Sequence, residues 1–313
     1  MLGAPFGRMP ELPEVETIIR DLNKKVLNRT FIDVWTDFPK VVRKPEDFEQ
    51  FKKEIKGKKI QKIWRRGKNI IFNLSDYIPP HRPPTEVGPS NRSLLIHQKL
   101  TGHLLLGKWE FSRGKWIPPA GPLAEKINTY IHLLFTLDNG QMLALSDLRK
   151  FAKVELWNNE GLKEELCSFG PEPLEKDFTF EKFKECFKGK RGKIKQVLMD
   201  QTVIAGIGNI YSDEILWQAK IYPFKNVSKL TDEELKEIYQ AMREILAKAI
   251  KLGGESISDF RRISGERGYF DKERKVYRRE GEPCPRCGTK IKRVKLGGRS
   301  VHYCPSCQRA KRT

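Results

Sequence analysis

Residues 194–219, IKQVLMDQTVIAGIGNIYSDEILWQA, decide the predicted fold of the C-terminal half of this chain. The stretch predicts two helices, Ile194 to Ala205 and Asn209 to Ala219, joined by a tight turn at Gly206-Ile207-Gly208. Asn209 opens the second helix, where free backbone N–H groups and the positive end of the helix dipole suit a phosphate oxygen. The alternative is an asparagine that caps the helix and binds no ligand.

A third helix is expected after this pair. Thr231 and Glu234 form a capping box, apolar residues follow on one helical face, and Gly253-Gly254 closes the helix. Those apolar positions predict a helical core.

The segment from about Ile60 to Trp157 has a different pattern, with short apolar and β-branched runs that predict the strands of an antiparallel sandwich. The runs are Ile70–Phe72, Leu94–Ile96, Leu104–Leu106, Tyr130–Leu137, Met142–Leu145 and Val154–Trp157. Ile78 to Ser93 carries five prolines and predicts a long exposed loop. Ser168 to Leu174 is typical of a domain linker.

Four of the six cysteines are spaced for a metal. Cys284, Cys287, Cys304 and Cys307 form two C-x2-C pairs separated by sixteen residues, the spacing of a tetrahedral zinc site. A pair of disulfides is the alternative, which a reducing cytosol disfavours. Four thiolates leave no open position on the metal, so the zinc is expected to be structural. Cys167 and Cys186 are expected to be small buried apolar residues or ordinary thiols.

The formal net charge is +20, and residues 261–313 contribute +12 of it. This concentration favours a surface that binds nucleic acid over an evenly solvated lysine-rich surface or an anionic membrane. No apolar stretch reaches the roughly 18 residues that cross a membrane, and Met1 to Arg8 lacks the apolar core of a signal peptide. We therefore expect a soluble, cytoplasmic protein.

Residues 10–17, PELPEVET, follow a second methionine, Met9. The bland interpretation is a helix start, because Pro13 suits the first turn and Glu14 and Glu16 suit the helix dipole. If Met9 is the true start and is removed, Pro10 carries a free secondary amine that can attack a sugar C1′ and form an iminium. With Met9 attached, the same nitrogen is an inert amide.

The N-terminal string resembles that of the formamidopyrimidine-DNA glycosylases, bacterial enzymes of base-excision repair. The resemblance continues in the same order through residues 65–68 (RRGK), 147–151 (DLRKF), 170–174 (GPEPL), 200–223 and the four-cysteine tail. It covers the chain from Met9 to about Gln308 apart from loops. It implies a multidomain α+β fold: an N-terminal antiparallel β-sandwich with a flanking helix, a helical helix-two-turn-helix domain and a C-terminal zinc hairpin, with DNA between the two larger domains.

The resemblance implies four catalytic residues. Pro10 is the Schiff-base nucleophile, and Glu11 is the proton donor, with Glu14 as a second carboxylate that orients the site. Lys68 is the proton donor for β-elimination. Arg299, at the glycine-rich tip of the zinc hairpin, grips phosphate and is the proton donor for δ-elimination.

The resemblance also implies the residues that contact DNA. Lys195 and Asn209 bind phosphates, while Arg149, Phe151 and Leu100 fill the void left by an extruded base. Leu100 stands where the family usually has methionine, and leucine is shorter and stiffer, which puts the efficiency of lesion search in doubt. Ser264 to Phe270 corresponds to the loop that recognises the lesion in the purine-specific enzymes.

The expected function is a bifunctional glycosylase that removes 8-oxoguanine and formamidopyrimidines from DNA and cleaves the abasic site by β,δ-elimination. One alternative is a relative of endonuclease VIII that acts on oxidised pyrimidines, although Leu12 in the N-terminal string favours the purine branch. The other is a zinc-containing DNA-binding protein without catalysis. We expect one structural zinc ion, double-stranded damaged DNA as the partner, no membrane partner and a monomer.

The expected domains are a catalytic sandwich at 9–167, a linker at 168–178, the helix-two-turn-helix domain at 179–262, and the lesion-recognition loop with the zinc finger at 263–313. Residues 1–8 form an N-terminal extension that we expect the mature enzyme to lack.

Overall fold

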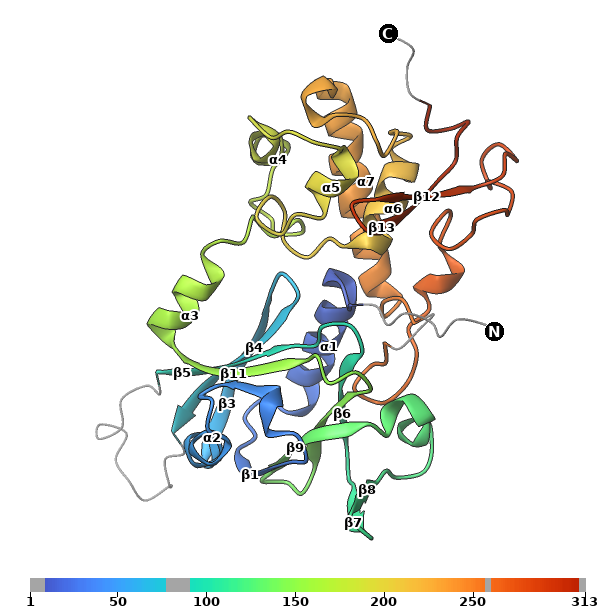
Figure 1. Ribbon diagram of the computed structural model, residues 1–313. Coiled ribbons are helices and arrows are strands. Elements are labelled where there is room, and N and C mark those ends of the chain that lie inside the picture. The colour runs from blue at the N-terminus through green and yellow to red at the C-terminus, as the bar shows by residue number, and fades with distance from the viewer. Residues whose placement is uncertain (1–8, 77–90, 257–259, 310–313) are drawn as a thin grey trace. The chain divides into compact units, whose positions relative to one another are not determined.

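The computed structural model describes residues 9–76, 91–256 and 260–309, so the expected leader at 1–8 and nearly all of the expected loop at 78–93 lie outside the described residues (Figure 1). The chain forms two compact units. Of the described residues, the first unit comprises those within 9–10, 14–167 and 253–268, and the second comprises those within 11–13, 168–252 and 269–309.

The first unit is a β-sandwich, as predicted, with one four-stranded and one five-stranded sheet. The first sheet has the order β1 (Phe31–Thr36), β9 (Ile131–Leu137), β10 (Met142–Asp147), β6 (Gly102–Gly107). The second has the order β2 (Val42–Lys44), β11 (Lys153–Asn158), β5 (Arg92–His97), β4 (Asn69–Asp76), β3 (Lys58–Arg66). Every pair in the two sheets is antiparallel except β11–β2, which is parallel.

Smaller elements complete this unit. They are the helices α2 (Phe48–Ile55) and α3 (Asn159–Leu166), the hairpin β7 (Glu110–Ser112) and β8 (Lys115–Ile117), and the 3-10 turns η1 (Pro39–Val41), η3 (Pro122–Ala124) and η4 (Lys126–Asn128). Helix α1 (Leu12–Lys25) begins where the N-terminal string predicted a helix start, and it buries Val15, Ile18 and Leu22 in the sandwich core.

The second unit contains four helices and a C-terminal hairpin within the residues that the structure describes. The helices are α4 (Phe180–Phe187), α5 (Ile194–Leu198), α6 (Asn209–Gln218) and α7 (Asp232–Lys251), with the turns η5 (Val227–Lys229) and η6 (Phe270–Lys272). The hairpin is β12 (Lys292–Leu296) and β13 (Arg299–Tyr303). The predicted capping box at Thr231 and Glu234 is present, and Gly253 and Gly254 follow α7 at positive φ.

Helix α5 is much shorter than predicted, and the expectation that it continues to Ala205 is wrong. Polar side chains satisfy the backbone here in place of a helix. Asp200 accepts from the backbone N–H of Thr202 at 2.9 Å. Gln201 accepts from Gly206 at 2.8 Å and donates to the carbonyls of Met199 and Ile207. Such side-chain hydrogen bonds compete with the backbone hydrogen bonds of a helix, so the segment after Leu198 forms turns instead of continuing α5.

Within the described residues, no helix combines the length and the apolar character that a membrane span requires.

Candidate functional site

Glu11 is held at the start of α6 by three backbone hydrogen bonds within the second unit. Its carboxylate accepts from the N–H groups of Gly208 at 2.8 Å, Ile210 at 2.9 Å and Tyr211 at 3.3 Å. The side chain is buried, and a Cβ on Gly208 would lie 2.4 Å from the Glu11 carboxyl carbon. A carboxylate at this place satisfies free N–H groups and interacts favourably with the positive end of the helix. Pro10, directly before it, is also buried.

This arrangement corrects the sequence argument about Asn209. The helix cap is Gly208, so the alternative in which Asn209 caps the helix is wrong. The N–H groups expected to be free for a phosphate are those that Glu11 occupies. The Asn209 Oδ1 is buried and has no hydrogen-bond partner among the described residues. The role of Asn209 as a phosphate ligand stays a prediction.

Lys195 lies beneath Asn209 and is buried, with 1% of its side chain exposed. Its Nζ donates to the Asn209 carbonyl at 3.2 Å, to the Ser212 hydroxyl at 3.2 Å and to the Asp213 carboxylate. A protein carboxylate therefore already compensates the charge that the sequence argument assigned to phosphate. Arg299 opens β13 and is exposed. Together with Lys195 it lines a cavity of about 150 Å³, so these two predicted residues meet in the second unit.

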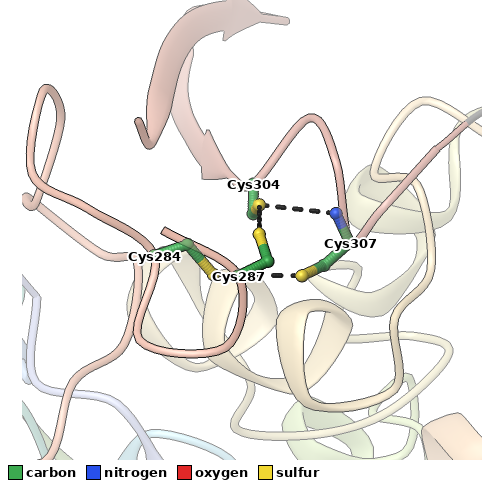
Figure 2. Close-up of side chains that lie close together, drawn as sticks. All are labelled: Cys284, Cys287, Cys304 and Cys307. Carbon is green, nitrogen blue, oxygen red and sulfur yellow. Dashed lines mark hydrogen bonds between the residues drawn. The ribbon is translucent and has the colours of Figure 1, made fainter. Parts of the chain in front are cut away.

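The four cysteines of the zinc-type spacing converge, as Figure 2 shows. All four Sγ atoms lie within 4.8 Å of one another, and the distances are 3.9 Å for Cys284–Cys307 and 3.4 Å for Cys287–Cys304. A tetrahedral zinc with Zn–S bonds of about 2.3 Å needs sulfurs about 3.8 Å apart, so these residues fit the ion. One structural zinc ion per chain, held by these four thiolates, is the cofactor.

Helix α6 contacts this cluster through its last turn. The Trp217 indole N–H donates to Cys284 Sγ at 3.4 Å, and the guanidinium of Arg286 lies 4.0 Å above the Trp217 ring. Arg286 also donates to the carbonyl of Trp217 at 3.0 Å, and this carbonyl at the helix C-terminus accepts from Lys220 N–H as well. The sequence argument missed Trp217, although a tryptophan at the end of the predicted helix was visible.

In the first unit, Lys68 lies in the β3–β4 turn, after Gly67 at a φ of 56°. It is one of three lysines around His97. Burial first, and then the charges of Lys99, Lys68 and Lys153, lower the pKa of His97 to about 3. The imidazole is therefore neutral at physiological pH within a strongly positive surrounding. The sequence predicted no role for His97. A histidine closing a strand before a basic loop was the available signal.

One buried carboxylate, that of Asp147, links the two loops whose side chains are expected to fill the void left by an extruded base. Asp147 accepts from the Thr101 hydroxyl, from Arg149 N–H at 3.2 Å and from Ala152 N–H at 2.7 Å. The structure thus brings Leu100, next to Thr101, into the same region as Arg149 and Phe151. Phe151 is 47% exposed, and the Arg149 guanidinium lies 4.6 Å from its ring. An exposed ring on a fixed loop can be inserted between bases.

The carboxylate of Glu14, the second carboxylate expected at the site, accepts from Glu255 N–H at 2.8 Å in the first unit. Contacts with residues 122–125 hold the chain just before and within the expected lesion-recognition loop, Ser264 to Phe270. Arg261 makes two bonds to Glu125, at 2.7 and 2.9 Å, and Arg261 lowers the pKa of Glu125 to about 2. Gly265 packs so closely on Pro122 that a Cβ would lie 2.8 Å from its carbonyl carbon.

Three family models match this chain. The family model described as the formamidopyrimidine-DNA glycosylase N-terminal domain matches residues 9–154. The formamidopyrimidine-DNA glycosylase H2TH domain matches residues 169–261, and the zinc finger found in FPG and IleRS matches residues 281–310. The three matches follow one another along the chain and include the sandwich, the paired helices and the cysteine cluster.

Individual relatives agree with this. The chain is 39% identical over 305 residues to a formamidopyrimidine-DNA glycosylase of Pelotomaculum thermopropionicum, covering 97% of this chain and 100% of that protein. It is 35% identical to one of Bacillus cereus, covering 96% and 99%. A solved Lactococcus lactis FPG variant with Fapy-dG DNA has a TM-score of 0.81 at 35% identity, covering 96% and 100%. The Lactococcus lactis Fpg with abasic-site DNA has a TM-score of 0.80 at 36% identity, with the same coverage.

Proposed function

Because this chain belongs to the formamidopyrimidine-DNA glycosylase family, we propose that it excises oxidised purines from duplex DNA with Pro10 as its nucleophile. It is a DNA repair enzyme with glycosylase and abasic-site lyase activity, and its partner is DNA that carries damaged bases or abasic sites. Solved relatives are bound to Fapy-dG, abasic-site or 8-oxo-G DNA, which supports this lesion class.

The placement of Glu11 carries the catalytic proposal. Its carboxylate is buried directly after Pro10 and is fixed by three N–H groups at the start of α6. In the proposed reaction the Pro10 amine forms a bond to C1′ as the bond from C1′ to the base breaks. The departing base takes a proton from solvent. The carboxylate of Glu11 takes the proton that the Pro10 nitrogen releases and passes it to the ring oxygen, so the bond from C1′ to that oxygen breaks, the sugar opens and an iminium remains. Lys68 and then Arg299 supply protons in the two eliminations.

This chemistry requires Pro10 to be the first residue, since an acylated proline has no nucleophilic nitrogen. An α-amino group titrates near 8, so much of it is neutral at pH 7. We propose that translation begins at Met9 and that the methionine is removed, because a small second residue permits its removal. The match to the family's N-terminal domain begins at residue 9, which supports this start.

Borohydride trapping on an 8-oxoguanine duplex tests the proposal, since reduction of an iminium leaves a permanent crosslink. A protein that begins at Met9 is expected to crosslink, whereas one that keeps residues 1–8 is expected to bind without crosslinking. Equal crosslinking of both, with the leader still attached by mass spectrometry, would exclude Pro10 and point to a lysine such as Lys68. A matched duplex with an oxidised pyrimidine separates the purine assignment from the endonuclease VIII-like alternative.

The enzyme acts where bacterial DNA lies, in the cytoplasm, and we further propose that its charge of +20 keeps it on the nucleoid.

A further inference from the structure

Asp213 forms the centre of a buried polar network in the second unit. One carboxylate oxygen accepts from Lys195 Nζ. The other accepts from the backbone N–H of His302 at 2.9 Å and lies 3.0 Å from the His302 ring Nδ1. Because a carboxylate only accepts, Nδ1 carries the proton in this contact. The side chains of Asp213, Lys195 and His302 are at most 2% exposed, so the network is nearly shielded from solvent.

The network joins the elements that carry the predicted phosphate ligands. Asp213 lies one helical turn after Asn209 on α6, and Lys195 on α5 also donates to the Asn209 carbonyl. His302 lies three residues after Arg299 on the same strand, β13. One carboxylate thus connects the start of α6 to the strand of the zinc hairpin.

Stability alone does not explain such a network. A buried ion pair contributes little net stability, because removing two charges from water offsets their attraction. A displaced β13 would leave a buried carboxylate with fewer donors, which is costly. The network therefore favours one register between hairpin and helix over neighbouring ones.

We propose that Asp213 is a positioning residue that holds Arg299 and Asn209 as one rigid phosphate-binding pair. This inference rests on the proposed function in one respect, namely that Arg299 and Asn209 bind DNA phosphates. Asp213 itself touches no DNA and acts through His302 and Lys195. Without Asp213, strand β13 is free to shift, and the guanidinium of Arg299 is no longer held in one position relative to Asn209.

The test is a double-mutant cycle on binding to a duplex with a tetrahydrofuran abasic analogue, which is not cleaved. His302→Phe keeps a ring against Tyr277, whose ring centroid lies 4.9 Å away, but removes the bond from Nδ1 to Asp213. Arg299→Ala is expected to weaken binding by the full-length protein about tenfold or more, as for loss of a charge-assisted hydrogen bond. In the His302→Phe background it should cost less than about threefold, because the two residues act as a unit.

The slope of affinity against salt concentration gives a second readout. Each lost phosphate contact reduces the slope by about 0.9, so His302→Phe should lower it as Arg299→Ala does. Val301→Ala removes packing from the same strand and leaves the polar network intact. Glu280→Gln alters the 3.7 Å contact of Glu280 with His302 Nε2 and its 3.3 Å ion pair with Arg293, and leaves the contacts of Asp213 in place. Both controls should leave the cost of Arg299→Ala unchanged.

A cost of Arg299→Ala that is the same in both backgrounds, with zinc content intact, would overturn the inference. If His302→Phe fails to fold, Lys195→Met combined with Asp213→Leu removes the pair without leaving a lone buried charge and enters the same cycle. If Arg299→Ala has no effect on binding in the otherwise unchanged protein, the proposed phosphate contact fails instead. The two failures are therefore distinguishable.

Discussion

Gln98 is a residue whose environment does not suit it. Its side chain is 1% exposed, and neither amide atom has a hydrogen-bond partner among the described residues. A buried unsatisfied polar group costs about 1–3 kcal/mol. Gln98→Leu should therefore raise the free energy of unfolding by about 1 kcal/mol or more, measured by denaturant titration.

Asn128 provides the matched control for Gln98. It is fully buried, its amide donates to the Pro122 carbonyl at 2.8 Å, and its oxygen lies 2.8 Å from His103 Nε2. Asn128→Leu should therefore destabilise the protein. A stabilising effect of both changes, or of neither, would contradict the assignment.

His97 and His103 make stability depend on pH. Burial is the first cause in both, and it lowers the pKa of His97 to about 3 and of His103 to about 4. The unfolded chain, with a histidine pKa near 6.5, binds more protons than the folded chain below that pH. Stability should therefore fall as the pH drops from about 6.5 towards 4, by at most about 1.4 kcal/mol per pH unit for each histidine. Denaturant titrations at pH 7 and 5 should give a smaller difference for His97→Asn than for the unchanged protein.

At the scale of elements, the start of α6 is fixed by Glu11 and by the missing Cβ of Gly208. Gly208→Ala should displace the carboxylate, because the new Cβ would lie 2.5 Å from Glu11 Oε1, while φ at this position is an ordinary −133°. We expect excision of 8-oxoguanine to fall roughly 100-fold or more, as when a general acid is lost. Glu11→Gln should have a similar effect, and the double variant should be little worse. Additive losses would show that the two residues act separately.

The zinc finger is the second element with a measurable consequence. Cys304→Ser should remove zinc, and DNA binding should weaken because β13 loses its support. Trp217 fluorescence should change at the same time, since its indole N–H donates to Cys284. Cys167→Ser, at an exposed thiol outside the cluster, is the control and should change neither. Less than roughly half an equivalent of zinc in the purified protein, with DNA binding intact in chelator, would refute the role of the ion.

At the scale of the whole molecule, the charge of +20 governs association with DNA. The logarithm of the binding constant for undamaged duplexes should fall steeply and linearly with the logarithm of the salt concentration. The binding constant should depend little on the DNA sequence. Arg299→Ala should weaken binding to lesion and abasic duplexes alike. Fluorescence anisotropy over a range of salt concentrations measures both effects. A change confined to the choice of base would show that Arg299 reads bases rather than phosphates.

The sequence by itself determined the features that depend on local spacing. Apolar patterns predicted α6, α7 and most strands, the N-terminal string predicted the start of α1, and the cysteine spacing predicted the zinc site. Each of these features depends on residues that lie close together in the sequence. Local periodicity failed at 199–205, where the side chains of Asp200 and Gln201 satisfy the backbone in place of a helix. His97 and Trp217 were not predicted as site residues, because only the fold brings Lys68 and Lys153 to His97 and the Cys284 sulfur to Trp217.

Only the tertiary structure decided how the site residues are satisfied. Glu11 accepts from backbone N–H groups about 200 residues away in the chain, at the start of α6. Lys195 pairs with Asp213, and Asp213 holds His302 across 89 residues. Buried charges must find partners wherever the fold brings them, and no spacing rule in the sequence specifies which partner that is.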